Sequence, residues 1–480
     1  MRHRAVILLG AVLLLSTSVF AQNTDIESLS GLQFNFGNPG ARSLGMGGAF
    51  LGLADDASAA EANPAGLTIL RRPEVSLEGR NYETIAIVNT TGFYPDLVQE
   101  EFNAFSRAAE VNFASVVLPF GKGAISAYYH LPLAYESEIN AAWETNIFNV
   151  ARPRSLPNFF MPVTDPPGSS GPISEAECEA LRDDTGDPFS CLQFQTFPYF
   201  SAVNIKLQTW GLAGAYQFGR LSLGAAYRYH QFEEAAITQR TDLQVRNLRT
   251  EVFQATVNSA GDIVKESDST FVFGFKYAPS DRFSIGGAYK EGASFDTSIF
   301  LNDIAGGTGL SDLGGSTFHV PDVWGVGVSW RPMPVLTINV DGVNVSYGNL
   351  TDDFQSIYPE IQILGNNAYE TEDATEVHVG AEYFFASTIP FALRAGWWRD
   401  PAHQMKYVGP QTCTDEAIDS SFRTLCAANR TVLGILFPGS EDDDHWSVGF
   451  GLAWPRFQVD AAYETSDRLK VGSLSGVFRF

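Results

Sequence analysis

The chain has 480 residues and a formal net charge of −24 at pH 7, from 31 Lys and Arg against 55 Asp and Glu. This acidic balance argues against a nucleic-acid partner, because phosphate binding needs Lys and Arg clusters that are absent here. The 36 Phe, 17 Tyr and 8 Trp accompany a near-neutral mean hydropathy, as expected where a β-barrel meets lipid.

The first 21 residues predict an export signal. A basic start is followed by an apolar run over residues 5–15, and the small-residue end Val19-Phe20-Ala21 favours cleavage after Ala21. The apolar run is too short for a membrane anchor, and no later segment has about twenty consecutive apolar residues. The sequence therefore predicts an exported chain without a transmembrane helix.

Four cysteines form two pairs of identical spacing, Cys178 with Cys191 and Cys413 with Cys426. In an exported protein this pattern favours two local disulfides, each closing a small loop. A metal site is the alternative, but it would need closer spacing or accompanying histidines. We expect no metal and no cofactor.

Residues 22–73 differ from the rest of the chain. They are rich in Gly and Ala, show no sustained strand alternation, and contain the turn signal Asn63-Pro64. A flexible tail would be more polar than this. We interpret this stretch as a compact N-terminal hatch or plug.

From residue 74 onward, a two-residue period recurs. Trp446, Val448 and Phe450, for example, alternate with small residues, and the aromatic face matches the girdles of membrane barrels. The predicted strands, about fourteen in number, lie near 74–88, 109–119, 122–133, 199–217, 220–236, 267–278, 281–299, 317–331, 334–347, 373–386, 389–400, 445–454, 456–464 and 471–480.

Short connections alternate with long ones, as in outer-membrane barrels. The sequence thus predicts an all-β fold, a transmembrane antiparallel β-barrel over residues 74–480 with long extracellular loops and the hatch inside its lumen. An even strand number puts both termini on the periplasmic side and both cysteine pairs in external loops. The terminal Phe480 resembles the last-strand signal that the barrel assembly machinery of bacterial outer membranes recognises.

The sequence contains no phosphate-binding loop, zinc-binding His pair or nucleophile elbow. Asp55 and Asp56 are adjacent carboxylates, but a turn or charge-pairing role within the plug is the better interpretation. His130 and His230 on predicted strands lack a partner that would suggest hydrolysis. We expect that the chain is not an enzyme.

The stretch from Gly40 to Leu70, with its Gly-Met-Gly-Gly-Ala-Phe and Asn-Pro-Ala-Gly-Leu motifs, resembles the hatch of the FadL/TodX outer-membrane transport family. The barrel pattern and Phe480 agree with this resemblance, which covers essentially the whole mature chain. It implies a monomeric barrel that moves long-chain fatty acids or aromatic and aliphatic hydrocarbons across the outer membrane. Its surroundings would be outer-membrane lipid and lipopolysaccharide.

The resemblance implies a gate at the turn formed by Asn63, Pro64, Ala65 and Gly66. Candidate substrate contacts, for which packing of plug against wall is the alternative, are Phe34, Phe36, Phe50, Phe159, Phe160 and Met161. In the family a kink in an early strand opens the wall sideways. Pro132 on the third predicted strand is the candidate for that opening, with ordinary strand termination as the alternative.

The chain departs from a typical fatty-acid transporter in its acidic loops and its predicted loop disulfides. Arg228 and Arg394 lie on predicted strands, but no basic residue is clearly placed to hold a carboxylate, which leaves neutral hydrocarbons open. The competing hypothesis is a secretion-associated or docking barrel without a transport role, since similar glycine-rich and Asn-Pro-Ala-Gly-Leu stretches occur there. A general diffusion porin is disfavoured by the glycine-rich plug.

Overall fold

The computed structural model describes residues 36–90, 100–147, 193–241, 248–303, 309–351, 369–404, 406–407 and 441–480. Most of these residues lie in strands. The helices among them are short: α3 (Ala41–Leu44), α4 (Ala59–Ala62), η1 (Pro64–Ile69) and η2 (Tyr347–Thr351). No helix in the described ranges is both long and apolar enough to cross a membrane.

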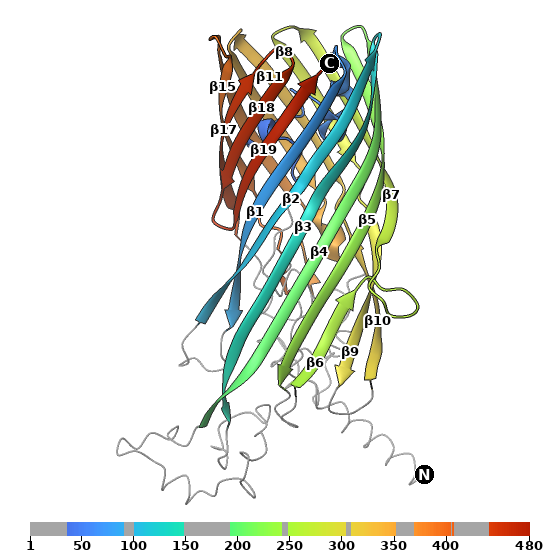
Figure 1. Ribbon diagram of the computed structural model, residues 1–480, viewed down its shortest axis with the longest axis vertical. Helices are drawn as coiled ribbons and strands as arrows, with labels where there is room; N and C mark the ends of the chain where they lie inside the picture. The colour runs from blue at the N-terminus through green and yellow to red at the C-terminus, as the bar shows by residue number, and fades with distance from the viewer. Residues whose placement is uncertain are drawn as a thin grey trace, which may run out of the picture.

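One antiparallel sheet dominates the molecule (Figure 1). Its strands are β1 (Glu74–Thr90), β2 (Glu100–Phe120), β3 (Gly123–Ile147), β4 (Gln193–Phe218), β5 (Leu221–Thr241), β6 (Leu248–Ala255), β7 (Glu266–Ser280), β8 (Phe283–Lys290), β9 (Ser294–Asp303), β10 (Gly309–His319), β11 (Val323–Met333), β12 (Leu336–Val345), β14 (Ala374–Phe385), β15 (Phe391–Asp400), β17 (Asp443–Ala453), β18 (Phe457–Thr465) and β19 (Leu469–Arg479). The two-residue strands β13 (Tyr369–Glu370) and β16 (Lys406–Tyr407) pair separately.

The sheet closes on itself because its last strand pairs with its first. β19 is antiparallel to β1 from the pair Glu74↔Arg479 to the pair Thr84↔Leu469. β6, β9 and β10 continue the lines of β7, β8 and β11 across short interruptions. In the described part of the chain the wall therefore has fourteen antiparallel strands, which confirms the predicted fold class.

Side-chain alternation gives the barrel an apolar outside. On β17, Trp446 and Val448 are 62% and 60% exposed, whereas the alternate residues His445 and Ser447 are 2% and 4% exposed. A water-soluble protein would direct its polar residues outward instead. An apolar outer face on a closed barrel is the arrangement that lipid requires.

The short turns gather at one end of the barrel, where the C-terminus also lies (Figure 1). Gly121 and Gly219, with φ of 54° and 63°, occupy two of these turns in the left-handed region that glycine adopts without strain. At the opposite end β1, β3, β5 and β9 stop, each before a stretch that lies outside the described residues and that the sequence predicts to be part of a long loop. We call this end the long-loop end.

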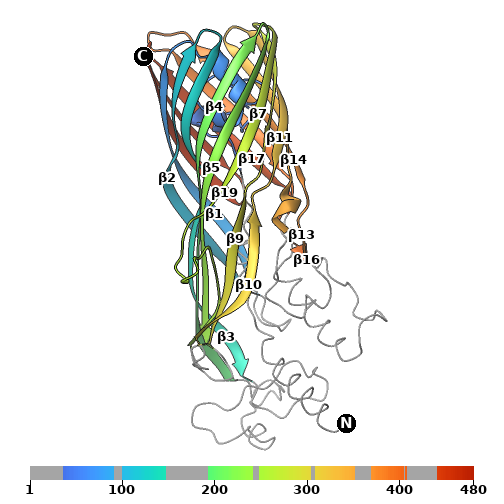
Figure 2. The ribbon, with the colours of Figure 1, turned by 90° about the vertical axis from the view of Figure 1, so that its right-hand side faces the viewer.

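The wall is much taller on one side than on the other (Figures 1 and 2). β2 to β5 have 21 to 26 residues, whereas β11 to β19 have at most 12. Part of what the sequence assigned to long loops is therefore strand, including residues 100–108, 134–147 and 193–198. These stretches show little alternation of apolar and polar residues, so the sequence did not indicate strands there.

Residues 36–70, the N-terminal segment, lie inside the barrel near its short-turn end (Figure 2). η1 packs against β4, β5 and β7, and α3 packs against β17, β18 and β19 across the lumen. Met46, Phe50 and Leu67 are fully buried in a core shared with wall residues. Burial against the wall gives this helix-poor segment the fixed structure that its own short helices cannot supply.

Candidate functional site

Asn63 fixes the turn between α4 and η1. Its backbone is extended, as the following proline favours, and its side-chain oxygen accepts a hydrogen bond from the Ala65 N–H at 3.2 Å. Its Nδ2 donates to the carbonyl of Leu51 at 3.1 Å and to that of Phe275 on β7 at 3.0 Å. One buried side chain thereby joins two parts of the N-terminal segment to the wall.

Glycines on the strands allow the N-terminal segment to lie directly against the wall. A Cβ at Gly224 on β5 would be 2.4 Å from the backbone nitrogen of Ala65, and one at Gly286 on β8 would be 2.2 Å from the Leu51 carbonyl oxygen. Other wall glycines that meet the segment closely are Gly274, Gly327, Gly380, Gly396 and Gly449. The small inner face that the sequence showed is thus the docking surface for the segment.

Charged side chains also hold the N-terminal segment to the wall. The Asp341 carboxylate on β12 accepts hydrogen bonds from the backbone N–H groups of Phe50 and Leu51 at 2.6 and 2.7 Å. Arg42 on α3 donates through two nitrogens to the Glu382 carboxylate on β14, both at 2.9 Å. Charge-assisted and bidentate contacts of this kind restrict geometry as well as adding energy.

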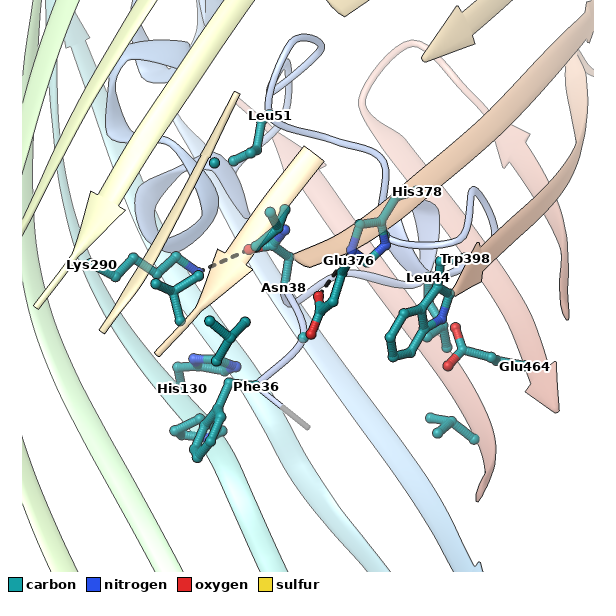
Figure 3. A pocket seen from close by; sticks show the side chains of 18 of the residues that line it. Phe36, Asn38, Leu44, Leu51, His130, Lys290, Glu376, His378, Trp398 and Glu464 are labelled. Atoms are coloured by element: carbon teal, nitrogen blue, oxygen red, sulfur yellow. Dashed lines mark hydrogen bonds and ion pairs between the residues drawn. The ribbon is translucent and has the colours of Figure 1, made fainter. Parts of the chain in front are cut away.

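A cavity of about 90 Å³ lies between the N-terminal segment and the wall (Figure 3). Its apolar lining includes Phe36, Leu51, Pro132, Val323, Val343 and Trp398. It is smaller than the roughly 150 Å³ of an apolar cavity that accepts benzene. In this arrangement the cavity is closed to a molecule of that size.

The charged groups that line the cavity have partners. Lys290 donates to the Asn38 side chain at 2.9 Å, and Arg80 donates to the Glu78 carboxylate at 2.6 Å. His378 lies 3.0 Å from the Glu376 carboxylate (Figure 3). The lining therefore offers an apolar surface edged by polar groups that already have partners.

A cluster of apolar side chains continues from the cavity toward the long-loop end. Phe36, Val323, Val343 and Val345 belong both to the cavity lining and to this cluster. Beyond them Phe232 stacks on two further rings, with centroids 4.7 Å away at Phe295 and 4.8 Å away at Phe318. The outer cluster, as we call it, also contains Tyr135, Val203, Ile205, Leu207, Tyr347 and Leu350.

The wall beside the cavity is interrupted between β2 and β3. β2 pairs with β1 along residues 100–117, and β3 pairs with β4 along most of residues 123–147. Pairing between β2 and β3, however, ends at Phe113↔His130. Pro132, which has no N–H to donate, lies just past this end, where the register of β3 against β4 shifts between His130 and Leu133. The end of this ladder and the cavity meet at Pro132.

The predicted substrate-contact residues lie in different environments. Phe36 lines the cavity, whereas Phe50 is packed against the wall and is not among the described residues that line it. Phe34, Phe159, Phe160, Met161 and the cysteines Cys178, Cys191, Cys413 and Cys426 lie outside the described residues.

The basic and acidic candidates all join ion pairs. Arg228 contacts Glu61 of the N-terminal segment at 3.2 Å, and Arg394 contacts Glu382 and Asp460 at 2.7 and 2.8 Å. Asp55 pairs with Arg42, as a charge-pairing role within the plug would require. Lys290 and Glu61 were not predicted as site residues. Each is a single charge on a strand or a short helix, and its partner comes from a distant part of the chain that only the closed barrel brings near.

The two predicted histidines are buried and lie within polar networks. His130 Nδ1 is 4.0 Å from the Glu61 carboxylate, and His230 bonds to the hydroxyls of Thr209 and Thr270 at 2.9 and 2.8 Å. In the parts of the chain that the structure describes, no three His, Cys, Asp or Glu side chains are arranged to hold a metal ion.

Solved structures share this architecture across almost the whole chain. The Pseudomonas putida toluene transporter TodX matches with a TM-score of 0.53 and 12% identity, over 93% of this chain and 99% of that one. The Ralstonia pickettii toluene transporter TbuX matches with a TM-score of 0.52 and 15% identity, over 93% and 100%. The fold is that of the FadL/TodX transporters.

A Pseudomonas aeruginosa FadL homologue matches this FadL/TodX fold with a TM-score of 0.52 and 13% identity, over 91% of this chain and 97% of that one. No family model and no curated protein sequence matches the chain. The likeness therefore lies in the fold, and it agrees with the resemblance found in the sequence. Among the proteins with this fold, CymD is described as a monoaromatic hydrocarbon channel and TbuX as a toluene transporter.

Proposed function

We propose that this chain moves hydrophobic small molecules across the bacterial outer membrane, with the N-terminal segment as its gate. One observation carries the proposal: the cavity wall joins the outer cluster at Val323 and Val343 and reaches the end of the β2–β3 ladder at Pro132. Apolar side chains, most of them buried against one another in this arrangement, thus extend from the outer cluster to the interruption in the wall. The toluene transporters of the same fold support this function.

The proposed path starts at the outer cluster, whose rings Phe232 and Phe295 are buried against each other and would have to part to admit a solute that the polysaccharide layer excludes. A solute would move on to the cavity, and then leave either sideways past Pro132 or along the axis past the N-terminal segment. Because the cavity is smaller than one benzene ring requires, either route needs a rearrangement of its lining. The turn at Asn63, Pro64, Ala65 and Gly66 holds the segment in place and is the proposed gate.

The substrate class within this proposal comprises long-chain fatty acids and aromatic or aliphatic hydrocarbons. The chain would work as a monomer among outer-membrane lipid and lipopolysaccharide, after insertion by the barrel assembly machinery. The competing docking function would not require an apolar cavity connected to an apolar cluster, so the cavity favours transport.

Uptake by cells tests the proposal. A strain lacking the chain should take up labelled alkylbenzenes or long-chain fatty acids more slowly than its parent, and re-expression of the chain should restore the rate. A small hydrophilic solute serves as the control, and its uptake should not change. Equal uptake of every apolar compound by the two strains would contradict transport and leave the docking function.

A further inference from the structure

Glu61 on α4 is a buried carboxylate with several partners on the wall. Its Oε1 lies 3.2 Å from Arg228 on β5 and 3.6 Å from Lys290 on β8. Its Oε2 accepts a hydrogen bond from the Tyr128 hydroxyl on β3 at 2.7 Å, and His130 Nδ1 is 4.0 Å away. Glu61 is 3% exposed, so these contacts are shielded from water.

The wall side of this contact is built independently of Glu61. Arg228 also donates to the Thr270 hydroxyl at 3.1 Å and to the carbonyl of Glu291. Arg228 and Lys290 are each only 8% exposed. Two buried cations and a phenol hydroxyl therefore converge from three strands on one point, and a single carboxylate occupies it.

The point of convergence borders the cavity. Lys290 and His130 both line the cavity, and Lys290 also contacts Asn38 near the start of the N-terminal segment (Figure 3). A group inside the cavity can thus reach the same ammonium that contacts Glu61. Moving the segment away without a replacement anion would leave two buried cations without a counter-charge, which is strongly unfavourable.

We propose that Arg228, Lys290 and Tyr128 form a carboxylate-binding site in the wall, that Glu61 is its resident ligand in the closed arrangement, and that a carboxylate arriving through the cavity releases the N-terminal segment by replacing Glu61. The inference rests on the proposed gate role of this segment. It assigns to acidic amphiphiles a direct effect on the gate that neutral hydrocarbons lack. It also explains how a lumen in which Arg228 and Lys290 already contact a carboxylate can still respond to an acid.

Chemical rescue tests the site. In Glu61→Ala the alanine retains Cβ, and acetate supplies the two missing carbons with the carboxylate. We expect acetate to bind the purified, folded Glu61→Ala protein at least about tenfold more tightly than it binds the wild type, because the internal competitor is gone. Calorimetry of the full chain in detergent measures this, with the heat-dependent gel shift of folded barrels as a check on folding.

Matched variants sharpen the measurement. Asp460→Asn removes another buried luminal carboxylate that pairs with an arginine, and it should leave acetate affinity at the wild-type level. Glu61→Gln preserves the size of the side chain and serves if Glu61→Ala does not fold. Adding Arg228→Gln to either Glu61 variant should abolish the gain in acetate affinity.

Three ligands show whether the carboxylate or the alkyl chain is responsible for tighter binding. Acetate and decanoate should both bind the Glu61 variants more tightly than the wild type, whereas decanol should show no such gain. A gain for chloride or phosphate without one for acetate would overturn the carboxylate assignment, and so would equal acetate affinity in wild type and Glu61 variants. Binding of acetate is measured without uptake, so the two proposals fail separately. Equal acetate affinity would refute the carboxylate site without bearing on transport. Unchanged uptake would refute transport without bearing on the carboxylate site.

Discussion

The two halves of the barrel differ in the backbone pairing between β2 and β3. In the turn half, between the short turns and the pair Phe113↔His130, β2 and β3 hydrogen-bond to each other, and the lumen is filled by the N-terminal segment. In the outer half, β2 pairs only with β1 and β3 only with β4, and the outer cluster lines the wall. Continuous pairing between β2 and β3 coincides with the lumen that the N-terminal segment fills, and interrupted pairing coincides with the outer cluster.

This difference indicates where the chain can change shape. In the turn half, any movement of the wall would disturb both the hydrogen-bonded ladder and the backbone contacts at the wall glycines. In the outer half, β2 and β3 can move apart without loss of a ladder between them. Of the three variants described next, two disturb contacts in the turn half, and the third permits β2 and β3 to pair further into the outer half.

Replacing Asn63-Pro64 with Ala-Ala should have the largest effect. Asn63 makes three hydrogen bonds, to the Ala65 N–H and to the carbonyls of Leu51 and Phe275, and the loss of each costs about 0.5–1.5 kcal/mol. We expect the N-terminal segment to leave its closed position, with altered uptake of apolar solutes and increased ion conductance in planar bilayers. The barrel itself should still assemble.

Ile69→Ala is the matched control, since this side chain lies on the same segment but is 42% exposed. It should behave like the wild type in both measurements. Unchanged uptake and conductance in the Ala-Ala variant would exclude a gating role for the turn.

Gly224→Ala should have the next largest effect. The added Cβ would meet the backbone of Pro64 and Ala65 at 2.5 and 2.4 Å, and such overpacking costs about 1–3 kcal/mol. Gly214→Ala on the neighbouring strand is the control, because a Cβ there meets nothing within 4 Å. Proteolysis of the N-terminal segment should be faster in Gly224→Ala than in Gly214→Ala, and equal rates would refute close docking at this glycine.

Pro132→Ala should have the smallest effect. It restores a backbone N–H beyond the end of the β2–β3 ladder and permits pairing to extend, with a gain of about 1 kcal/mol or less per added bond. We expect slower hydrogen exchange beside residue 132 and reduced uptake of apolar solutes. Pro119→Ala, within the paired part of β2, should leave uptake unchanged, and a larger effect there than at Pro132 would contradict a lateral path.

Much of the wall could be predicted because lipid imposes a simple pattern. Each of the fourteen predicted segments overlaps a strand of the structure, since outward side chains such as Trp446 and Val448 must be apolar at every second position. The prediction was wrong about the length of β2 to β4, because the sequence of their outer parts shows little apolar alternation. Pro132 was identified from its missing donor, but the end of the β2–β3 ladder beside it involves residues of two different strands.

The site was less predictable than the wall. Phe36 lies at the cavity, but Phe50 belongs to the packing of segment against wall, and composition alone does not distinguish the two environments. The partners of Arg228 and Arg394 also could not be predicted. Their carboxylates come from positions 167 residues away at Glu61 and from other strands at Glu382 and Asp460.

The sequence by itself determined the barrel, its strand order and the unusual character of residues 40–70, because period-two alternation and glycine-rich turns are local properties. Only the tertiary structure decided which glycines receive the N-terminal segment, which cations face Glu61 and where the ladder between β2 and β3 ends. These features depend on closure of the sheet, which brings β5, β8 and β3 around one helix of four residues. Closure is a long-range event, and no local pattern in the chain encodes its register.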